Sequence, residues 1–441
     1  MGIFSKFLNK DDENSAEKTR VVKFGRFSEN GENDFSDALR QVCDEFYEKH
    51  EYVEAYITLF NYLQKYGGPA IKVTENQKDD SLEFTLIQGS KTVKGSISSQ
   101  EVFVRAEVAS FTKLNVALMR YLLTQNSNFS YCKFAIEGNV ISLVQRCPAR
   151  DMSPEAFKEM LSELARNADG IDDVLVDEFA SLIPINVDNI VYLPEEEVET
   201  KLFFIRCWIE ETEKLLLTTD NETTRTYIIF RLIFKLLYLI SPEGTLLNEL
   251  RWAYHTYEEF DENEGNAPEI NFKMMEIIRG IYRKTDEELA KSLYTVPAVF
   301  PELSYVPFGD VVQSLASQLD MVEECVDARR EDLVVVVCEF LVGSHQFHQG
   351  MPQIATDLLL VFWRTLNPEF FVGLGFEEVF YDSQTQKLKA MKISEEIDRI
   401  IRYYSKYYKG LSFNTANLDF GSQANFAYTF LQEFCVLGSA F

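Results

Sequence analysis

The chain has 441 residues, enough for two or three domains, and 46% of them are hydrophobic, with 35 Phe and 21 Tyr. A disordered protein lacks that much bulky apolar surface, so we expect a folded chain with a large core. Asp and Glu total 70 against 43 Lys and Arg, and the net charge of −27 argues against nucleic acid or an anionic membrane as a partner. The same charge favours basic peptides or proteins as partners, although solubility alone is the simpler explanation.

Residues 9–33 are polar and charged, and we expect residues 1–33 to form a flexible N-terminal segment. Acidic residues follow the first apolar ones too soon for a signal peptide. One alternative stays open for this segment, a transient contact with a membrane or a partner through one apolar face. That face would comprise Ile3, Phe4, Phe7 and Leu8.

A small α+β domain is predicted over residues 34–182. It begins with a helix over 34–65, which has His50 at the edge of its apolar face and ends at Gly67-Gly68-Pro69. Apolar and polar residues then alternate, which predicts three antiparallel strands joined by short connections. The strand patterns are Leu82–Leu86, Val93–Ile97 and Val102–Val108.

The pattern continues with a helix near 114–122, two strands around Glu137-Gly138-Asn139, and a helix that has Ser153 as its N-cap. An acidic segment at Asp172-Asp173 closes the domain. The expected order is therefore helix, three strands, helix, two strands, helix. On the outward face of the sheet, Phe103 and Arg105 form a candidate partner surface if that face is open.

Residues 183–194 are predicted to be a linker, and residues 195–441 an all-α domain, because the strand period nearly vanishes there. A proline-rich loop at 294–307 is a candidate boundary between two lobes of this domain. Residues 376–391 have room for one short hairpin. We found no fixed-period repeat, which argues against a solenoid.

The most apolar run, Ile228–Ile240, is shorter than a bilayer requires, and Arg231 and Lys235 interrupt it. These two cations lie four residues apart and therefore share one stripe of a helix. We interpret the run as the central helix of a soluble bundle and expect no integral membrane association.

Seven cysteines are spread along the chain without a CxxC pair. An odd number of cysteines among mostly apolar neighbours is typical of reduced thiols, which pack as small hydrophobes. We therefore expect a reducing compartment and a cytoplasmic location. The cysteines are Cys43, Cys132, Cys147, Cys207, Cys325, Cys338 and Cys435.

The stretch from Leu114 to Phe179 carries a resemblance to a known family. The residues concerned are LNVALMRYLLTQNSNFSYCKFAIEGNVISLVQRC and, after a short gap, SPEAFKEMLSELARNADGIDDVLVDEF. They are similar to the YbjN family of bacterial proteins, described broadly as sensory transduction regulators. The resemblance implies a fold like that of type III secretion chaperones and a module that binds segments of other proteins. It implies no catalysis, and it covers the N-terminal part alone.

No catalytic, cofactor-binding or metal-binding residue is assigned from the sequence. His345 and His348 lie three apart and could meet one metal ion together with Cys338, but a zinc site needs three or four protein ligands and no acidic or cysteine pair accompanies them. Gly373 and Gly375 lack the third glycine of a nucleotide-binding loop, so they predict a turn.

Two further groups have structural explanations. The run Glu195-Glu196-Glu197 begins a predicted helix, where carboxylates complement the helix dipole. Four tyrosines at helical spacing predict core packing, with a recognition surface as the alternative. They are Tyr403, Tyr404, Tyr407 and Tyr408.

The sequence thus predicts a non-enzymatic protein-binding module, chaperone-like or regulatory, that needs no cofactor. Its partner would be a protein or peptide, with a basic one favoured by charge and a homodimer as a further alternative. An enzyme or small-ligand-binding protein with its site in the helical half is the second hypothesis. A weaker third hypothesis is an immunity or anti-toxin protein, whose acidic charge would neutralise a basic toxin.

Overall fold

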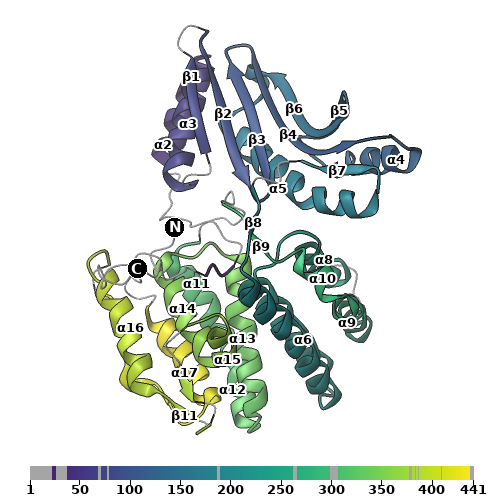
Figure 1. Cartoon of the computed structure of the whole chain (residues 1–441). Helices are drawn as coiled ribbons and strands as arrows, with labels where there is room; N and C mark the ends of the chain where they lie inside the picture. Colours follow the sequence, from purple (N-terminus) through teal and green to yellow (C-terminus); the bar gives the residue numbers. More distant parts are fainter. Residues whose placement is uncertain are drawn as a thin grey trace, which may run out of the picture. The chain divides into compact units, whose positions relative to one another are not determined.

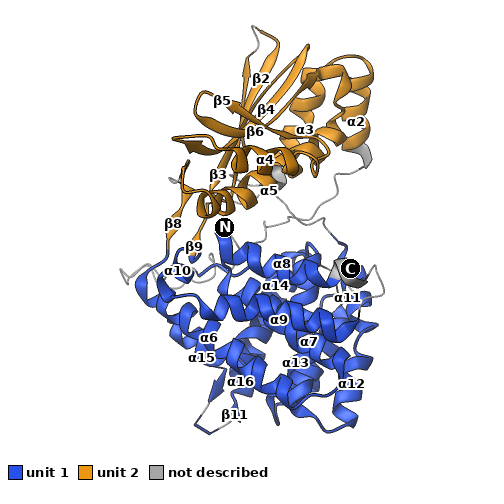
Figure 2. Cartoon of the chain, turned by 90° about the vertical axis from the view of Figure 1, so that its right-hand side faces the viewer, with its two compact units in different colours: residues 1–26, 193–293, 303–441 blue, residues 27–192, 294–302 orange. Residues whose placement is uncertain are grey.

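The structure is a computed structural model. It describes residues 22–25, 37–67, 71–76, 79–185, 189–261, 266–297, 306–376, 380–382, 384–385, 387–408 and 410–437. The chain forms two compact units, which are coloured separately in Figure 2. The helical unit comprises residues 1–26, 193–293 and 303–441, and the α+β unit comprises residues 27–192 and 294–302.

The α+β unit is an antiparallel sheet with helices packed on one face (Figure 1). Its helices are α2 (Asp37–Glu48), α3 (Tyr52–Gly67), α4 (Val116–Gln125) and α5 (Pro154–Glu178). Its strands are β1 (Ile71–Asn76), β2 (Ser81–Gln88), β3 (Lys91–Ser98), β4 (Glu101–Phe111), β5 (Lys133–Glu137), β6 (Val140–Pro148) and β7 (Leu182–Pro184). The strand order is β1-β2-β3-β4-β6-β5, and β7 also pairs with β4. A separate pair joins β8 (Val191–Tyr192) to β9 (Tyr294–Thr295).

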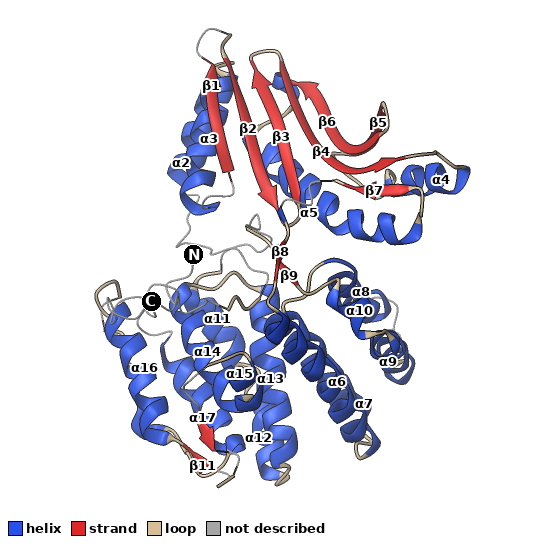
Figure 3. Cartoon of the chain, in the orientation of Figure 1, coloured by secondary structure: helices blue, strands red, loops and turns tan. Residues whose placement is uncertain are grey.

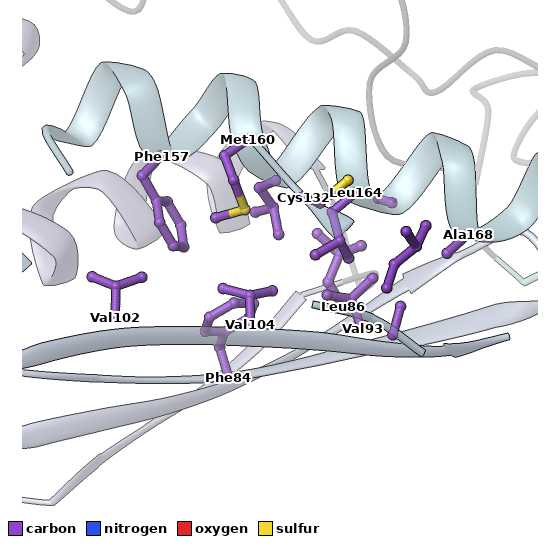
Figure 4. Close-up of a cluster of buried hydrophobic side chains, with 14 of the residues drawn as sticks. Phe84, Leu86, Val93, Val102, Val104, Cys132, Phe157, Met160, Leu164 and Ala168 are labelled. Atoms are coloured by element: carbon purple, nitrogen blue, oxygen red, sulfur yellow. The ribbon is translucent and has the colours of Figure 1, made fainter. Parts of the chain in front are cut away.

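The core of this unit lies between the sheet and helices α3 and α5. Alternate residues of β4 are buried, as the period of two predicts, and they lie on the face that α5 covers. Figure 4 shows side chains of the sheet and of α5 meeting in this layer. The sheet contributes Phe84, Leu86, Val93, Val102 and Val104, and α5 contributes Phe157, Met160, Leu164 and Ala168. The prediction of an antiparallel sheet in the first half, followed by helices, is confirmed.

The predicted helix over 34–65 is two helices in the structure. His50 has a φ of 62°, a left-handed conformation that breaks the helix between α2 and α3. Its Nδ1 atom lies 2.9 Å from the hydroxyl of Tyr52, and its side chain is exposed. The expected hydrogen-bond partner is therefore present, but His50 does not lie at the edge of the core.

The sheet contains a strand that the sequence did not predict. Strand β1 pairs antiparallel with β2, with Ile71 opposite Leu86. It is an edge strand in which Ile71 is buried and Val73 half-buried, so the alternation of apolar and polar residues covers only its first half. Strand β7 lies at the start of the predicted linker, and β9 lies in the predicted loop at 294–307.

The helical unit contains the helices α6 to α17 and one short hairpin (Figure 3). The helices are α6 (Glu195–Leu217), α7 (Glu222–Lys235), α8 (Gly244–Asp261), α9 (Ala267–Arg283), α10 (Asp286–Ala290), α11 (Phe308–Ala316), α12 (Asp320–Asp327), α13 (Glu331–His348), α14 (Gln353–Leu366), α15 (Pro368–Gly373), α16 (Ala390–Tyr404) and α17 (Gln423–Val436). The hairpin pairs β10 (Tyr381–Asp382) with β11 (Lys387–Leu388), inside the range predicted to hold one.

Helix α7 is the centre of this unit. It packs against α6, α8, α9 and α13, and every residue of Ile228–Ile240 is buried. Its last turn widens into a π-helix at Leu236–Ile240. No helix in the described ranges has the length and apolar character that crossing a membrane demands. The interpretation of this run as the central helix of a bundle is confirmed.

Candidate functional site

A backbone carbonyl without a helical partner lies at the end of the π-helix. In an α-helix the carbonyl oxygen of Tyr238 would accept from residue 242, but Pro242 has no N–H group. In a π-helix it would accept from Glu243, whose N–H donates instead to the carbonyl of Ser292 at 2.8 Å. The sequence therefore leaves this acceptor unsatisfied inside a buried region, which is costly unless another donor reaches it.

Two donors from outside the helix reach this carbonyl. The hydroxyl of Ser241, which has a φ of 50°, donates to it at 2.7 Å. The N–H of Gly25 lies 2.8 Å from the same oxygen and 2.7 Å from the hydroxyl oxygen of Ser241. A segment from near the start of the chain thus completes the hydrogen bonding at the end of the π-helix.

The side chain of Phe24, the residue before Gly25, enters a group of four aromatic rings. Phe24 is half-buried, and its ring stacks on Tyr238 with a centroid distance of 6.3 Å. Its centroid lies 5.2 Å from that of Phe371, 6.1 Å from that of Phe376 and 6.5 Å from that of Phe370. We call Tyr238, Phe370, Phe371 and Phe376 the aromatic cradle. Edge-to-face and offset contacts at these distances favour an aromatic occupant.

A helix C-cap fixes one side of the aromatic cradle. Gly375 has a φ of 84° and follows α15, its N–H donates to the carbonyl of Val372, and the N–H of Phe376 donates to the carbonyl of Phe371. These two bonds form a Schellman motif, which brings the side chains of Phe371 and Phe376 together at 5.2 Å. The predicted turn is present at Gly375, whereas Gly373 is the last residue of α15.

A network of buried charges lies next to the aromatic cradle. Glu339 on α13 is 2.5 Å from Arg231 and 3.3 Å from Lys235, both on α7, and it accepts from Asn367 at 2.9 Å. The ammonium group of Lys235 lies 4.5 Å above the ring of Trp208. Trp208 in turn packs 5.2 Å from Phe370 of the aromatic cradle.

The charges of this network offset one another in part, because one carboxylate lies between two cations. Burial acts to raise the pKa of Glu339, but Arg231, Lys235 and the Asn367 amide outweigh it and hold this pKa below its usual value. Burial, helped by Arg231, lowers the pKa of Lys235 to about 8 despite the attraction of Glu339. The network stabilises the packing of α7 on α13 beside the aromatic cradle.

The two histidines singled out in the sequence have separate partners. His345 is buried, with Nδ1 2.8 Å from the carbonyl of Leu341 and Nε2 3.2 Å from the hydroxyl of Ser314. His348 has Nε2 2.6 Å from the hydroxyl of Tyr254. Cys338 is buried, and burial raises the pKa of its thiol. Within the described ranges, no group of three or more His, Cys, Asp or Glu side chains could hold a metal ion.

The four tyrosines near the end of α16 divide between the two expected roles. Tyr404 is buried and donates to the carboxylate of Asp357 at 2.8 Å, which is core packing. Tyr407 is 61% exposed, and the ammonium group of Lys406 lies 4.8 Å from the centroid of its ring and 3.9 Å from that of Tyr403.

The acidic run at 195–197 begins α6 as predicted, and Glu197 forms a buried ion pair with Lys201 at 3.0 Å.

In the α+β unit, the acidic segment at the end of α5 meets a buried lysine. The ammonium group of Lys91 lies 2.6 Å from Asp172 and also donates to the carbonyls of Val108 and Ile185. The hydroxyl of Ser90 donates to Asp172 at 3.1 Å. This buried network ties the β2–β3 turn to α5 and explains the acidic pair structurally.

On the outward face of the sheet, charged side chains accompany Phe103 and Arg105. Arg105 forms ion pairs with Glu137 at 2.5 Å and with Glu107 at 3.2 Å. The guanidinium group of Arg146 lies 4.6 Å from the ring centroid of Phe103. Both candidate residues of this face are half-buried.

Sequence reasoning missed the segment at 22–25, which falls inside the region 1–33 predicted to be flexible. The structure places it in the aromatic cradle, while Ile3, Phe4, Phe7 and Leu8 lie outside the described residues. Two local features of the sequence are consistent with this placement: the pair Phe24-Gly25, and Pro242, which has no N–H group to continue the helix after Tyr238. No protein-family model matches the chain, and no curated protein matches its sequence.

Proposed function

We propose that this chain is a non-enzymatic protein-binding protein, chaperone-like or regulatory, whose helical unit accepts a short extended segment in the aromatic cradle. One observation carries the proposal: residues 22–25 occupy this site with both a side chain and a backbone N–H. Aromatic anchors in a pocket, together with backbone hydrogen bonds, are the usual means by which proteins hold extended peptides.

The similarity of residues 114–179 to the YbjN family also supports a protein-binding function, because that resemblance implies a module that binds segments of proteins. Helix α4 within this region presents three apolar side chains to solvent. Val116 is 66% exposed, Met119 36% and Leu123 65%. A stripe of this kind at helical spacing suits contact with a partner protein.

The alternative functions receive less support from the site. Glu339, Lys235 and His345 are buried and bonded to protein groups, which is the arrangement of a structural network and not that of an exposed acid–base pair. The seven cysteines are all unpaired thiols, which supports a proposed cytoplasmic location. An acidic immunity protein stays a weaker proposal that rests on net charge alone.

The test uses the full chain with Phe24→Ala, which removes the aromatic occupant. A fluorescein-labelled peptide with the sequence of residues 18–28, KTRVVKFGRFS, is titrated with this variant and followed by fluorescence anisotropy. We expect saturable binding, and no binding of the matched peptide in which the first Phe is Ala. If the two peptides give the same curve, the aromatic cradle is not a peptide-binding site and the proposal fails.

A further inference from the structure

We infer that residues 22–25 compete, within the chain, with a partner segment of defined chemistry: an aromatic residue followed by glycine, with Lys or Arg on either side. This inference rests on the proposed function and names the class of partner and the regulation of the same site. Three features of the site argue for this class, and a fourth argues for competition.

The first feature is the preference for an aromatic side chain. The occupant ring touches four aromatic rings, with stacking on Tyr238 and tilted contacts with Phe370, Phe371 and Phe376. Such contacts contribute roughly 0.5–1.5 kcal/mol per pair beyond the burial of area, and an aliphatic side chain would forgo them.

The second feature is the requirement for glycine after the aromatic residue. Gly25 is buried, and its φ of 68° is a conformation that residues with a Cβ atom rarely adopt. Its N–H must reach the carbonyl of Tyr238 and the hydroxyl of Ser241 at the same time. A side chain here would strain the backbone and weaken the hydrogen bonds of this N–H to Tyr238 and Ser241.

The third feature is charge. The segment around Phe24 is a basic stretch in a chain of net charge −27, with no acidic residue between Lys18 and Arg26. Its cations are Lys18, Arg20, Lys23 and Arg26. The net charge of −27 would steer a basic partner segment to the chain at low ionic strength, while the cation that lies over the aromatic cradle, Arg364 at 5.3 Å from the ring centroid of Phe376, shows that the attraction would come from the chain as a whole.

The fourth feature is the covalent connection. The segment is part of the same chain, so its effective concentration at the aromatic cradle is of the order of millimolar or higher. Its described part, residues 22–25, places one aromatic ring and one backbone N–H in the site, so we expect its own affinity to be modest. A partner segment that also binds beyond the aromatic cradle would therefore displace it, and binding would release the N-terminal segment.

The experiment compares wild type, Phe24→Ala and Gly25→Val as full chains, each titrated with the labelled peptide of residues 18–28. Gly25→Val should weaken the docking of residues 22–25 while it keeps the aromatic side chain. It therefore shows whether an effect of Phe24→Ala comes from lost docking or from that one substitution. Phe272→Ala removes an aromatic side chain that is 61% exposed on α9 and serves as the matched control. Three altered peptides carry Phe→Leu, Gly→Ala, or all four cations replaced by Gln.

We expect Phe24→Ala and Gly25→Val to bind the parent peptide at least roughly tenfold more tightly than wild type and the Phe272→Ala control do. Each altered peptide should bind at least about tenfold more weakly, and the uncharged one should lose most of the salt dependence. Equal affinity of wild type and both variants would overturn the competition. Equal affinity of parent and altered peptides would overturn the partner class. Absence of binding to every chain would instead remove the proposed function itself.

Discussion

At the scale of single residues, the helical unit depends on one buried carboxylate. Glu339 is the shared partner of Arg231, Lys235 and the Asn367 amide, and all four side chains are buried. Removing one member of a buried ionic network leaves an uncompensated charge, which costs more than the network contributes when intact. The two cations on α7 therefore make Glu339 more important for stability than an exposed glutamate.

We predict that Glu339→Gln lowers the free energy of unfolding by about 3 kcal/mol, because two buried cations lose their counter-charge. Glu369→Gln on α15 is the matched control, since Glu369 is exposed and should change stability by less than about 0.5 kcal/mol. Urea unfolding followed by circular dichroism measures both. Equal stability of the two variants would show that the network contributes little.

His345 gives the helical unit a dependence on pH. Burial lowers the pKa of this imidazole below its usual value of 6.5 and outweighs the carbonyl of Leu341, which acts to raise it. The neutral ring can accept at Nε2 from the hydroxyl of Ser314. A base whose pKa is depressed by folding contributes stability above its unfolded pKa and loses it as the pH falls through that value.

We therefore predict that α11, which carries Ser314, loses protection against amide hydrogen exchange below about pH 6.5. The rest of the helical unit should lose less protection over the same change of pH. His345→Gln keeps polar atoms at this position without a titrating group, so it should remove that part of the pH dependence. Hydrogen exchange with mass spectrometry at pH 5.5 and 7.5 decides the matter. An unchanged pH profile in the variant would contradict the account.

At the scale of elements, helix ends decide how the site is built. The π-helix ends where Pro242 withholds an N–H, and α15 ends where Gly375 adopts a left-handed conformation. The first creates the acceptor for Gly25, and the second sets Phe371 beside Phe376. Both helix ends depend on a residue with unusual backbone properties, a proline in one case and a glycine in the other. Such residues are visible in a sequence, but the contacts that they create in the fold are not.

Two glycines that look alike in sequence should respond in opposite ways to alanine. Gly375→Ala forces a Cβ atom into a φ of 84° and should destabilise the helical unit by about 1 kcal/mol or more. Gly280→Ala lies within α9 with open space for a Cβ atom and should stabilise by roughly 0.5–1 kcal/mol. Thermal unfolding measures the two shifts, and shifts of the same sign would disprove the assignment.

The elements that the sequence predicted correctly are those with a full repeating pattern. Strand β4 alternates buried and half-buried residues along its length, and α5 has both an N-cap and a continuous apolar stripe. Strand β1 was missed because a single residue of it is buried. The break at His50 was missed because an apolar stripe continues on both sides of it.

At the scale of the whole molecule, the position at which the N-terminal segment docks could not be derived from the sequence. Gly25 and Ser241 are 216 residues apart, so their contact depends on tertiary structure alone. A mostly polar N-terminal segment with few large apolar residues predicts flexibility by composition. The composition predicts a large core and gives an acidic net charge. The charge limits the chemistry of a partner, but it does not locate the site.

The unpaired thiols make a further prediction for the whole chain. Under denaturing conditions without reductant, a thiol reagent should titrate all seven cysteines. In the folded protein, Cys43, Cys132 and Cys338 should react slowly, because burial raises the pKa of each thiol. Fewer than seven thiols in the denatured chain would reveal a disulfide and contradict a reducing compartment.

The central claim is that Phe24 is held by the aromatic cradle, and a double-mutant cycle on trypsin cleavage after Lys23 tests it most directly. Phe24→Ala and Phe371→Ala should each accelerate this cleavage, and the double variant should be no faster than the faster single variant, because both changes remove one shared contact. Phe430→Ala, a buried aromatic of α17, controls for general loss of stability and should leave Lys23 protected. Rate increases that multiply in the double variant, or cleavage as fast in the wild type as in Phe24→Ala, would contradict the account.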